Sequence, residues 1–348
     1  MSRPGQSRLR RWRENALLAL SSSLICLAGL EGILRWWDVG DPPAFETNPQ
    51  YGFLMQPDQS VSTRGYRFRI NHAGLRGDDF LMPKPSAVYR IAFLGDSVTY
   101  GGGAVPDKDL FVNRVAFFLS ASEGRQVEPI NLSAPGWGIQ NMAGYVAAVG
   151  LYDADLVVWV ISSADFRRPK TSVVDNKFRA RKPNSRLLYV CNESWRKLSR
   201  LFLQGVSLHR DSYGDREILK RNLQVFQSTL AQITRKGTAV AVVVVPSLRG
   251  YEPVEDLLAF RSAAASCSVP FLDTAPAFHR PRSEELFLDG EHLRTPGHEI
   301  IADVIARFLK ENFFNSQPPN QLTRPHLGPR NPRPPRCSSA EPAGPPRN

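Results

Sequence analysis

The feature that most constrains the fold is a run of seven apolar residues, Ala239-Val240-Ala241-Val242-Val243-Val244-Val245. A strand with one face in water alternates apolar and polar residues, whereas a strand covered on both faces reads as a continuous β-branched run. The run is therefore typical of a central strand in a parallel sheet with helices on both sides. A shorter run, Ile91-Ala92-Phe93-Leu94, indicates a second strand of this kind.

Strands and helices alternate along the chain from residue 88. Apolar runs predict strands at 88–94, 127–132, 156–162, 239–245 and 269–272. Apolar residues at helical spacing predict helices at 110–122, 140–150, 216–235, 255–266 and 296–311. Five strands joined by helical crossovers form an α/β fold, a three-layer α/β/α sandwich around a five-stranded parallel sheet.

An apolar segment near the N-terminus predicts a membrane anchor. It follows an arginine-rich stretch, and it is just long enough to cross a bilayer. Glu31 and Arg35 lie one helical turn apart near its far end, where they can pair, and Trp36 and Trp37 suit the membrane interface. The arginines favour a cytoplasmic N-terminus. No clear small-x-small cleavage site follows the run, which favours an uncleaved anchor. A cleaved signal peptide and an ordinary buried helix are the alternatives.

Composition divides the chain into five parts. The last part is rich in proline and arginine and cannot bury enough apolar surface to order itself, so we expect it to be disordered. The expected parts are a basic cytoplasmic N-terminus (1–14), a transmembrane signal anchor (15–37), a turn-rich lead-in packed on the main domain (38–87), the α/β domain (88–315) with an insertion or cap at 166–212, and the tail (316–348).

The net charge of +11 does not indicate a nucleic-acid partner, because most of it lies at the two ends of the chain. The basic segment at 166–186 is expected to be a solvated loop or cap; the alternative is a basic rim that attracts an anionic glycan. The four cysteines have no metal-ligand spacing, so no metal or other cofactor is predicted. A disulfide between Cys191 and Cys267 is left open.

Two motifs predict nucleophilic catalysis. Gly95-Asp96-Ser97 follows a buried strand, so the serine hydroxyl lies at the carboxyl end of the sheet, where helix amides point toward a developing negative charge. Asp289 and His292 lie three residues apart in a Gly-containing turn. There the carboxylate can accept the imidazole Nδ1–H and leave Nε2 free to act as a base.

Together these motifs resemble those of the SGNH (GDSL-type) hydrolase family, over about residues 88–315. The resemblance implies a flavodoxin-like fold and a triad in which Ser97 is the nucleophile, His292 the base and Asp289 its partner. It also implies that the amides of Ser97 and Gly136 form the oxyanion hole, since Gly136 follows a strand that ends near Asn131.

The third motif of the family departs from the pattern. Where relatives carry an asparagine as a further oxyanion donor, this chain has Ala164, in Ser162-Ser163-Ala164-Asp165. A methyl group cannot donate a hydrogen bond, and losing one oxyanion donor costs about 100- to 1,000-fold in turnover. We therefore expect a slow enzyme, unless Ser162 or Ser163 supplies the hydrogen bond.

The chain also resembles a bacterial, membrane-anchored subgroup of the family, through its anchor and the spacing Asn71, Gly74, Arg76, Gly77. This implies a serine esterase on the periplasmic or extracytoplasmic side of the cytoplasmic membrane, acting on acylated glycans or other envelope esters. Two alternatives use the same fold. One is a polysaccharide O-acetyltransferase with the same triad, and the other is a catalytically weak or inactive glycan-binding scaffold.

Overall fold

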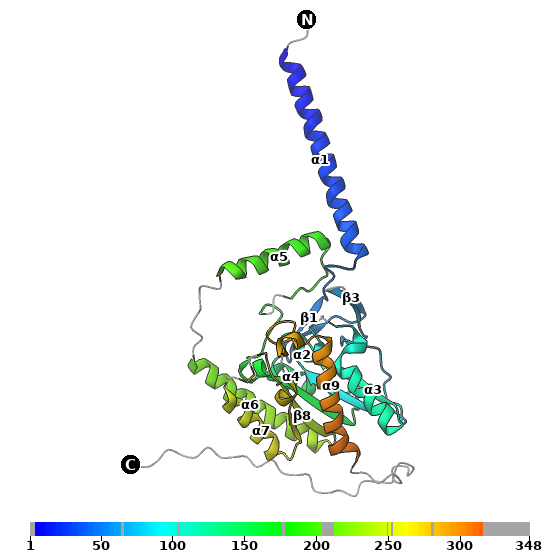
Figure 1. Ribbon diagram of the computed structural model, residues 1–348, viewed down its shortest axis with the longest axis vertical. Coiled ribbons are helices and arrows are strands. Elements are labelled where there is room, and N and C mark those ends of the chain that lie inside the picture. Colours follow the sequence, from blue (N-terminus) through cyan, green and yellow to red (C-terminus); the bar gives the residue numbers. More distant parts are fainter. Residues whose placement is uncertain are drawn as a thin grey trace, which may run out of the picture. The chain divides into compact units, whose positions relative to one another are not determined.

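Five parallel strands form the central sheet, in the order β6-β5-β7-β8-β9 (Figure 1). The computed structural model describes residues 4–63, 66–102, 105–175, 178–203, 212–248, 250–251, 253–279 and 282–315. The strands are β5 (Tyr89–Gly95), β6 (Val127–Ser133), β7 (Leu156–Ser162), β8 (Ala239–Val245) and β9 (Phe271–Asp273). The first strand of the sheet thus lies between the second and the third, which is the flavodoxin-like order.

Helices cover both faces of this sheet, which confirms the predicted three-layer sandwich. They are α3 (Phe111–Glu123), α4 (Ile139–Ala148), α6 (Ser212–Arg235), α7 (Val254–Ser266) and α9 (Thr295–Leu309). Shorter turns connect them: α2 (Ser97–Tyr100), η1 (Asp107–Asp109), η2 (Ser163–Arg167), α8 (Ala275–Phe278), η3 (Ser283–Leu286) and the π-helix η4 (Lys310–Phe314).

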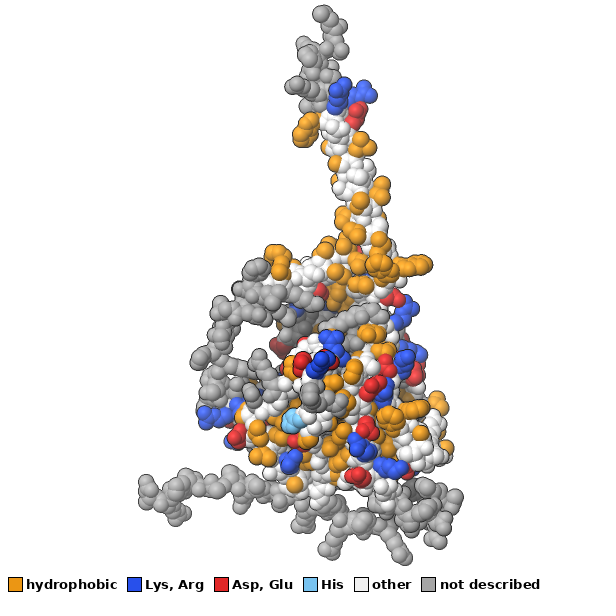
Figure 2. Space-filling model, viewed as in Figure 1, with side chains coloured by type: hydrophobic (Ala, Val, Ile, Leu, Met, Phe, Trp, Pro, Cys, Tyr) orange, Lys and Arg blue, Asp and Glu red, His pale blue; other side chains and the backbone are white. Residues whose placement is uncertain are grey.

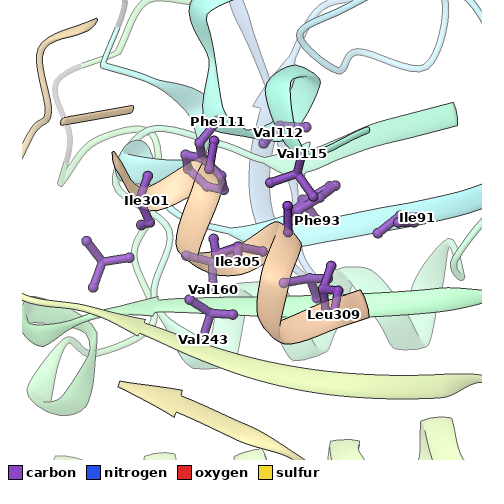
Figure 3. Close-up of a cluster of buried hydrophobic side chains, with 14 of the residues drawn as sticks. Ile91, Phe93, Phe111, Val112, Val115, Val160, Val243, Ile301, Ile305 and Leu309 are labelled. Carbon is purple, nitrogen blue, oxygen red and sulfur yellow. The ribbon is translucent and has the colours of Figure 1, made fainter. Parts of the chain in front are cut away.

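One face of the sheet packs against α3 and α9. Alternate residues of the strands, such as Phe93, Val160 and Val243, meet side chains of the two helices, such as Phe111 and Ile305, in one buried cluster (Figure 3). The opposite face carries Trp159, whose indole Nε1 lies 3.1 Å from the sulfur of Met142 on α4 and whose ring packs at a tilt against Phe226 on α6, with ring centroids 4.9 Å apart. Burial on both faces explains why the strands read as unbroken apolar runs.

The fifth strand begins at Phe271, two residues later than predicted. Ser268 has a positive φ of 55°, and the Val269 amide bonds the last turn of α7. Pro270 has no amide hydrogen to give to a ladder, although its carbonyl accepts from Val242. The turn therefore extends to Pro270, and the strand starts after it.

Before the sheet come a long helix and two small hairpin-sized sheets. The helix is α1 (Pro4–Trp36); β1 (Phe45–Asn48) pairs antiparallel with β2 (Gly52–Met55), and β3 (Gln59–Thr63) pairs with β4 (Tyr66–Ile70). Within α1, residues Arg10–Trp36 form a helix long and apolar enough to cross a membrane. Figure 2 shows its hydrophobic side chains exposed along its length.

The chain divides into two compact units, which we describe separately. One comprises Met1–Pro42, Val61–Arg67 and Arg181–Leu208, and the other comprises Pro43–Ser60, Phe68–Ala180 and His209–Asn348. Most of the predicted lead-in at 38–87 therefore belongs to the unit that contains the sheet. The predicted disordered tail at 316–348 lies outside the described residues.

The predicted loop or cap at 166–212 contains an 18-residue helix, α5 (Arg186–Leu203), which belongs to the same unit as α1. The prediction of a loop or cap named no helix here. Apolar residues at helical spacing do indicate one, among them Leu188, Cys191, Trp195 and Leu198. Cys191 is a free, exposed cysteine, so the disulfide with Cys267 that the sequence left open is not formed.

Candidate active site

Ser97 lies where β5 ends, between the ends of β6 and β7. Gly95 pairs with Ser133 of β6, and Leu94 pairs with Trp159 of β7, so the loops after all three strands meet at one edge of the sheet. This is the point where the strand order reverses, and ligands of such sheets bind there. A side chain at Gly95 would lie 2.0 Å from the hydroxyl of Thr99, which explains the glycine before the turn.

Asp96 holds the turn that presents Ser97. Its carboxylate is fully buried; Oδ1 accepts the amide of Val98 at 2.8 Å and so caps α2, and Oδ2 accepts the hydroxyl of Ser162 at 2.9 Å. The helix after the serine is only one turn long, because Gly101 ends it with a positive φ of 85°. The turn that carries Ser97 is therefore fixed mainly by the aspartate rather than by a long helix.

Asp289 and His292 occupy the loop that leads into α9. The Asp289 Oδ1 atom accepts the backbone amides of Glu291 at 2.9 Å and His292 at 2.8 Å, so the carboxylate is held by the same turn that carries the imidazole. Phe287 and Leu293 pair across the base of this loop, and the His292 carbonyl accepts the Leu288 amide. The three-residue spacing and the local turn therefore suffice to bring the Asp289 carboxylate and the His292 imidazole together.

The structure brings the three predicted residues together. His292 Nε2 lies 2.9 Å from Ser97 Oγ, and His292 Nδ1 lies 2.9 Å from Asp289 Oδ2. Partial burial opposes ionisation of Asp289, but the amides of His292 and Glu291 outweigh it and lower the pKa of this carboxyl. An ionised carboxylate can only accept, so the geometry assigns the proton of the neutral imidazole to Nδ1 and leaves Nε2 to accept from the serine.

Gly136 and Ala164 lie in the loops that follow the two neighbouring strands. Gly136 has a positive φ of 81°, and its carbonyl accepts the Thr171 hydroxyl at 2.6 Å. Ala164 is half-buried in η2, the turn directly after β7. Because Ser162 gives its hydroxyl hydrogen to Asp96, only Ser163 is left of the two serines that could replace the missing asparagine.

Arg168 is a site residue that the sequence analysis placed in a solvated segment, and that placement is wrong. Its guanidinium is mostly buried; Nη1 donates to the Trp137 carbonyl at 2.7 Å and lies 3.3 Å from Asp96 and 3.1 Å from Asp165. Its Nη2 lies 3.7 Å from Glu291, next to His292. Arg168 thus contacts the serine, glycine and histidine loops as well as its own.

Two buried carboxylates share this one guanidinium. Burial and the neighbouring Asp96 raise the pKa of Asp165 well above its usual range. Burial alone would lower the pKa of Arg168, but the carboxylates of Asp165, Asp96 and Glu291 raise it instead. Arg167, its neighbour in the basic segment, is half-buried and binds both oxygens of the buried Asp256, at 2.7 and 3.0 Å.

Gly102 is a second residue that sequence reasoning did not single out. It has a positive φ of 56° and lies against the imidazole, so that a Cβ atom there would be 3.0 Å from His292 Cδ2 and 3.2 Å from Cγ. A glycine cluster after Gly-Asp-Ser was visible in the sequence, but only the fold shows that one of these glycines faces a histidine 190 residues further on.

The Asn71–Gly77 segment stabilises the loop that follows Ser97. Asn71 closes its turn by accepting the amides of Ala73 and Leu75, both at 3.0 Å. The fully buried Arg76 side chain then bonds Asp107 at 2.8 Å and the Tyr100 carbonyl at 2.8 Å. The motif therefore has a structural role in this chain.

No metal site accompanies these residues: across the described ranges, no three His, Cys, Asp or Glu side chains are grouped so that they could hold an ion. The arrangement brings a hydroxyl, an imidazole and a carboxylate together. A serine whose proton can pass to an oriented imidazole is equipped for acyl transfer.

Solved structures with a similar fold include a lipase/acylhydrolase from Enterococcus faecalis, 18% identical, with a TM-score of 0.42 over 64% of this chain and 96% of that one. A two-domain esterase (CEX) active on acetylated mannans is 16% identical, with a TM-score of 0.44 over 64% and 49%. A catalytic mutant of Axe2, an acetylxylan esterase from Geobacillus stearothermophilus, is 16% identical, with a TM-score of 0.43 over 64% and 94%.

No match was found among curated proteins. The sequence profile of the GDSL-like Lipase/Acylhydrolase family, in contrast, matches residues 93–300, which is more than half of the chain. The matched region begins within β5 and ends within α9, so it includes the serine turn and the Asp289–His292 loop. The chain therefore belongs to the GDSL-like lipase/acylhydrolase family.

Proposed function

We propose that the protein is a serine esterase that uses Ser97, His292 and Asp289 as a catalytic triad. The observation that carries the proposal is the pair of contacts of His292, 2.9 Å from Nε2 to the Ser97 hydroxyl and 2.9 Å from Nδ1 to Asp289. His292 takes the hydroxyl proton as Ser97 attacks the ester carbonyl, and it returns that proton to the leaving alcohol. Water then attacks the acyl-enzyme by the same route and releases the acid.

The proposed oxyanion hole contains the amides of Ser97 and Gly136. Among the hydrogen bonds of the described residues, neither amide donates to a protein acceptor, so both are available to a substrate oxygen. Ala164 supplies no third donor, and the Ser162 hydroxyl is already bound to Asp96. If the Ser163 hydroxyl does not take the place of the asparagine, the oxyanion hole has two backbone donors, and we propose a turnover about 100- to 1,000-fold below that of a three-donor relative.

The proposed substrates are acyl esters, with acylated glycans or other esters of the cell envelope as the class that the family resemblance favours. The test uses the full-length chain in detergent and measures acetate release from p-nitrophenyl acetate and from acetylated xylan. Ser97→Ala should abolish release. Asp289→Asn should lower kcat by about 10,000-fold, as expected when the imidazole loses its orienting carboxylate.

Asp303→Asn is the matched control, because Asp303 is an exposed carboxylate that pairs with Arg307 on α9. It should leave the rate unchanged. A background rate that is equal in the wild-type protein and Ser97→Ala, together with no labelling of Ser97 by a fluorophosphonate, would contradict the proposal. Adding xylo-oligosaccharide as an acceptor separates hydrolysis from transfer, since transfer yields acetylated sugar at the expense of acetate.

We also propose that α1 anchors the protein in the cytoplasmic membrane with its N-terminus in the cytoplasm. Trp12 and Trp36 are 79% and 86% exposed, and they lie near the two ends of the apolar run. From Trp12 to Trp36 the helix advances by 24 residue positions and rises about 36 Å, close to the thickness of a bilayer core with part of its interfaces. Recovery of the full-length protein in the soluble fraction after lysis would contradict this proposal.

A further inference from the structure

The helix α5 exposes an apolar face. Leu188, Trp195 and Leu198 are 66%, 70% and 46% exposed, and Cys191 is also exposed. These positions are three or four residues apart, so they form one stripe along the helix. The ion pair between Glu193 and Arg196 lies on the other side. An exposed apolar stripe on an amphipathic helix is typical of a surface that another apolar surface covers.

The first turn of α5 is attached to the end of α1. The carboxylate of Glu31 accepts the Ser185 hydroxyl at 2.9 Å and the backbone amides of Arg186 at 3.1 Å and Leu187 at 2.9 Å. Free amides at a helix start need such acceptors. The Arg186 guanidinium in turn lies 3.3 Å from two carbonyls at the end of α1. The start of α5 is therefore held beside Glu31, at the same position along the axis of α1.

That level corresponds to the membrane interface if α1 crosses the bilayer. Glu31 precedes Trp36 by five residues, about 7 Å along the helix axis, which is about the thickness of one headgroup layer. Trp36 and Trp37 are both exposed, as side chains of an interfacial aromatic belt would be. In Figure 1, α5 runs sideways from the end of α1 rather than alongside it.

We propose that α5 is an interfacial helix whose partner is the phospholipid bilayer itself. Its stripe of Leu188, Cys191, Trp195 and Leu198 inserts among the acyl chains next to the point where α1 leaves the membrane, and the Glu193–Arg196 side faces water. An amphipathic helix with one apolar and one charged face binds membranes in this orientation. The inference rests on the proposed membrane span of α1, and it adds a second contact with the same leaflet.

The test is photocrosslinking in vesicles of phosphatidylcholine and phosphatidylglycerol that contain the full-length protein. Benzoylphenylalanine takes the place of Trp195 on the apolar stripe or of Glu193 on the charged side, and mass spectrometry measures lipid adducts. We expect at least five times more lipid adduct from position 195 than from position 193. Equal yields at the two positions would overturn the inference, as would crosslinks from position 195 to a second copy or to another part of the chain.

A third position separates this inference from the proposal on which it rests. Leu24 lies in the middle of α1 and is 58% exposed, so benzoylphenylalanine in its place should form lipid adducts if α1 spans the bilayer. Adducts from position 24 without an excess at position 195 would overturn the interfacial role of α5 alone. An absence of adducts at position 24 would overturn the membrane span and the role of α5 together.

Discussion

Replacing Gly102 with alanine should slow catalysis without unfolding the protein. The added methyl carbon would lie 3.0 Å from His292 Cδ2 and 3.2 Å from Cγ, closer than the roughly 3.5 Å at which carbon atoms normally touch. The imidazole must therefore retreat by about 0.3–0.5 Å from a position 2.9 Å from the Ser97 hydroxyl. Since a misplacement of about 1 Å can cost 100-fold, kcat should fall about 4- to 10-fold.

Gly124→Ala is the matched control for this variant. Gly124 has a φ of 63°, close to the 56° of Gly102, but no atom lies within 4 Å of the position of its added Cβ. Both variants should lose about 1 kcal/mol in the free energy of unfolding, because alanine is strained at positive φ. Only Gly102→Ala should lose activity.

The assays are urea unfolding, kcat for p-nitrophenyl acetate and the rate at which a fluorophosphonate labels Ser97. The reasoning is refuted if Gly102→Ala retains the wild-type kcat and labelling rate while its stability falls as expected. It is equally refuted if the two variants lose the same activity, because backbone strain rather than the contact with His292 would then be the cause.

Three further predictions test separate parts of the structure. Ala164→Asn should raise kcat for p-nitrophenyl acetate by up to about 100-fold, and an unchanged kcat would mean that this side chain does not face the oxyanion. Burial lowers the pKa of His298 to about 3, so the unfolded chain binds a proton that the folded protein cannot, and stability is lost as pH falls below 6.5. Urea unfolding of the wild-type protein should show about 2 kcal/mol less stability at pH 5 than at pH 7. His298→Gln should remove this difference. A difference of the same size in the variant would contradict the role given to His298. Arg168→Met leaves two buried carboxylates without their cation and should lower the free energy of unfolding at pH 7 by about 3–5 kcal/mol. Adding Asp165→Asn to this variant should restore part of the loss. A loss below about 1 kcal/mol in Arg168→Met would contradict the role of Arg168.

The behaviour of Arg168 shows why a run of basic residues is a poor guide to exposure. In the sequence it stands among several lysines and arginines, a pattern that usually marks a solvated surface. In the fold, its side chain turns inward because the buried Asp96 and Asp165 leave negative charge near the sheet edge that needs a cation. Nothing in the spacing of the basic residues predicts which of their side chains will be buried.

The strands of the central sheet could be predicted from the sequence because their burial on both faces requires apolar residues at every position. Residues 239–245 are apolar at every position, and a strand buried on both faces needs just that, so the sheet and its helical layers could be predicted. The Asp289–His292 pair could also be predicted, because the two residues are three positions apart and a single turn brings the carboxylate to the imidazole. These features rest on contacts between near neighbours in the chain.

Only the tertiary structure could decide the features that join distant segments. The hydrogen bond from Ser97 to His292 spans 195 residues, and the close approach of Gly102 to the same ring depends on how the loops after β5 and before α9 meet. The attachment of α5 to Glu31 likewise joins residues more than 150 positions apart. The sequence by itself determined the five strands of the central sheet, which serine follows the first of them and which histidine has a carboxylate partner. Packing decided which distant groups share a site, because that depends on the whole arrangement of buried surfaces and charges rather than on any local pattern.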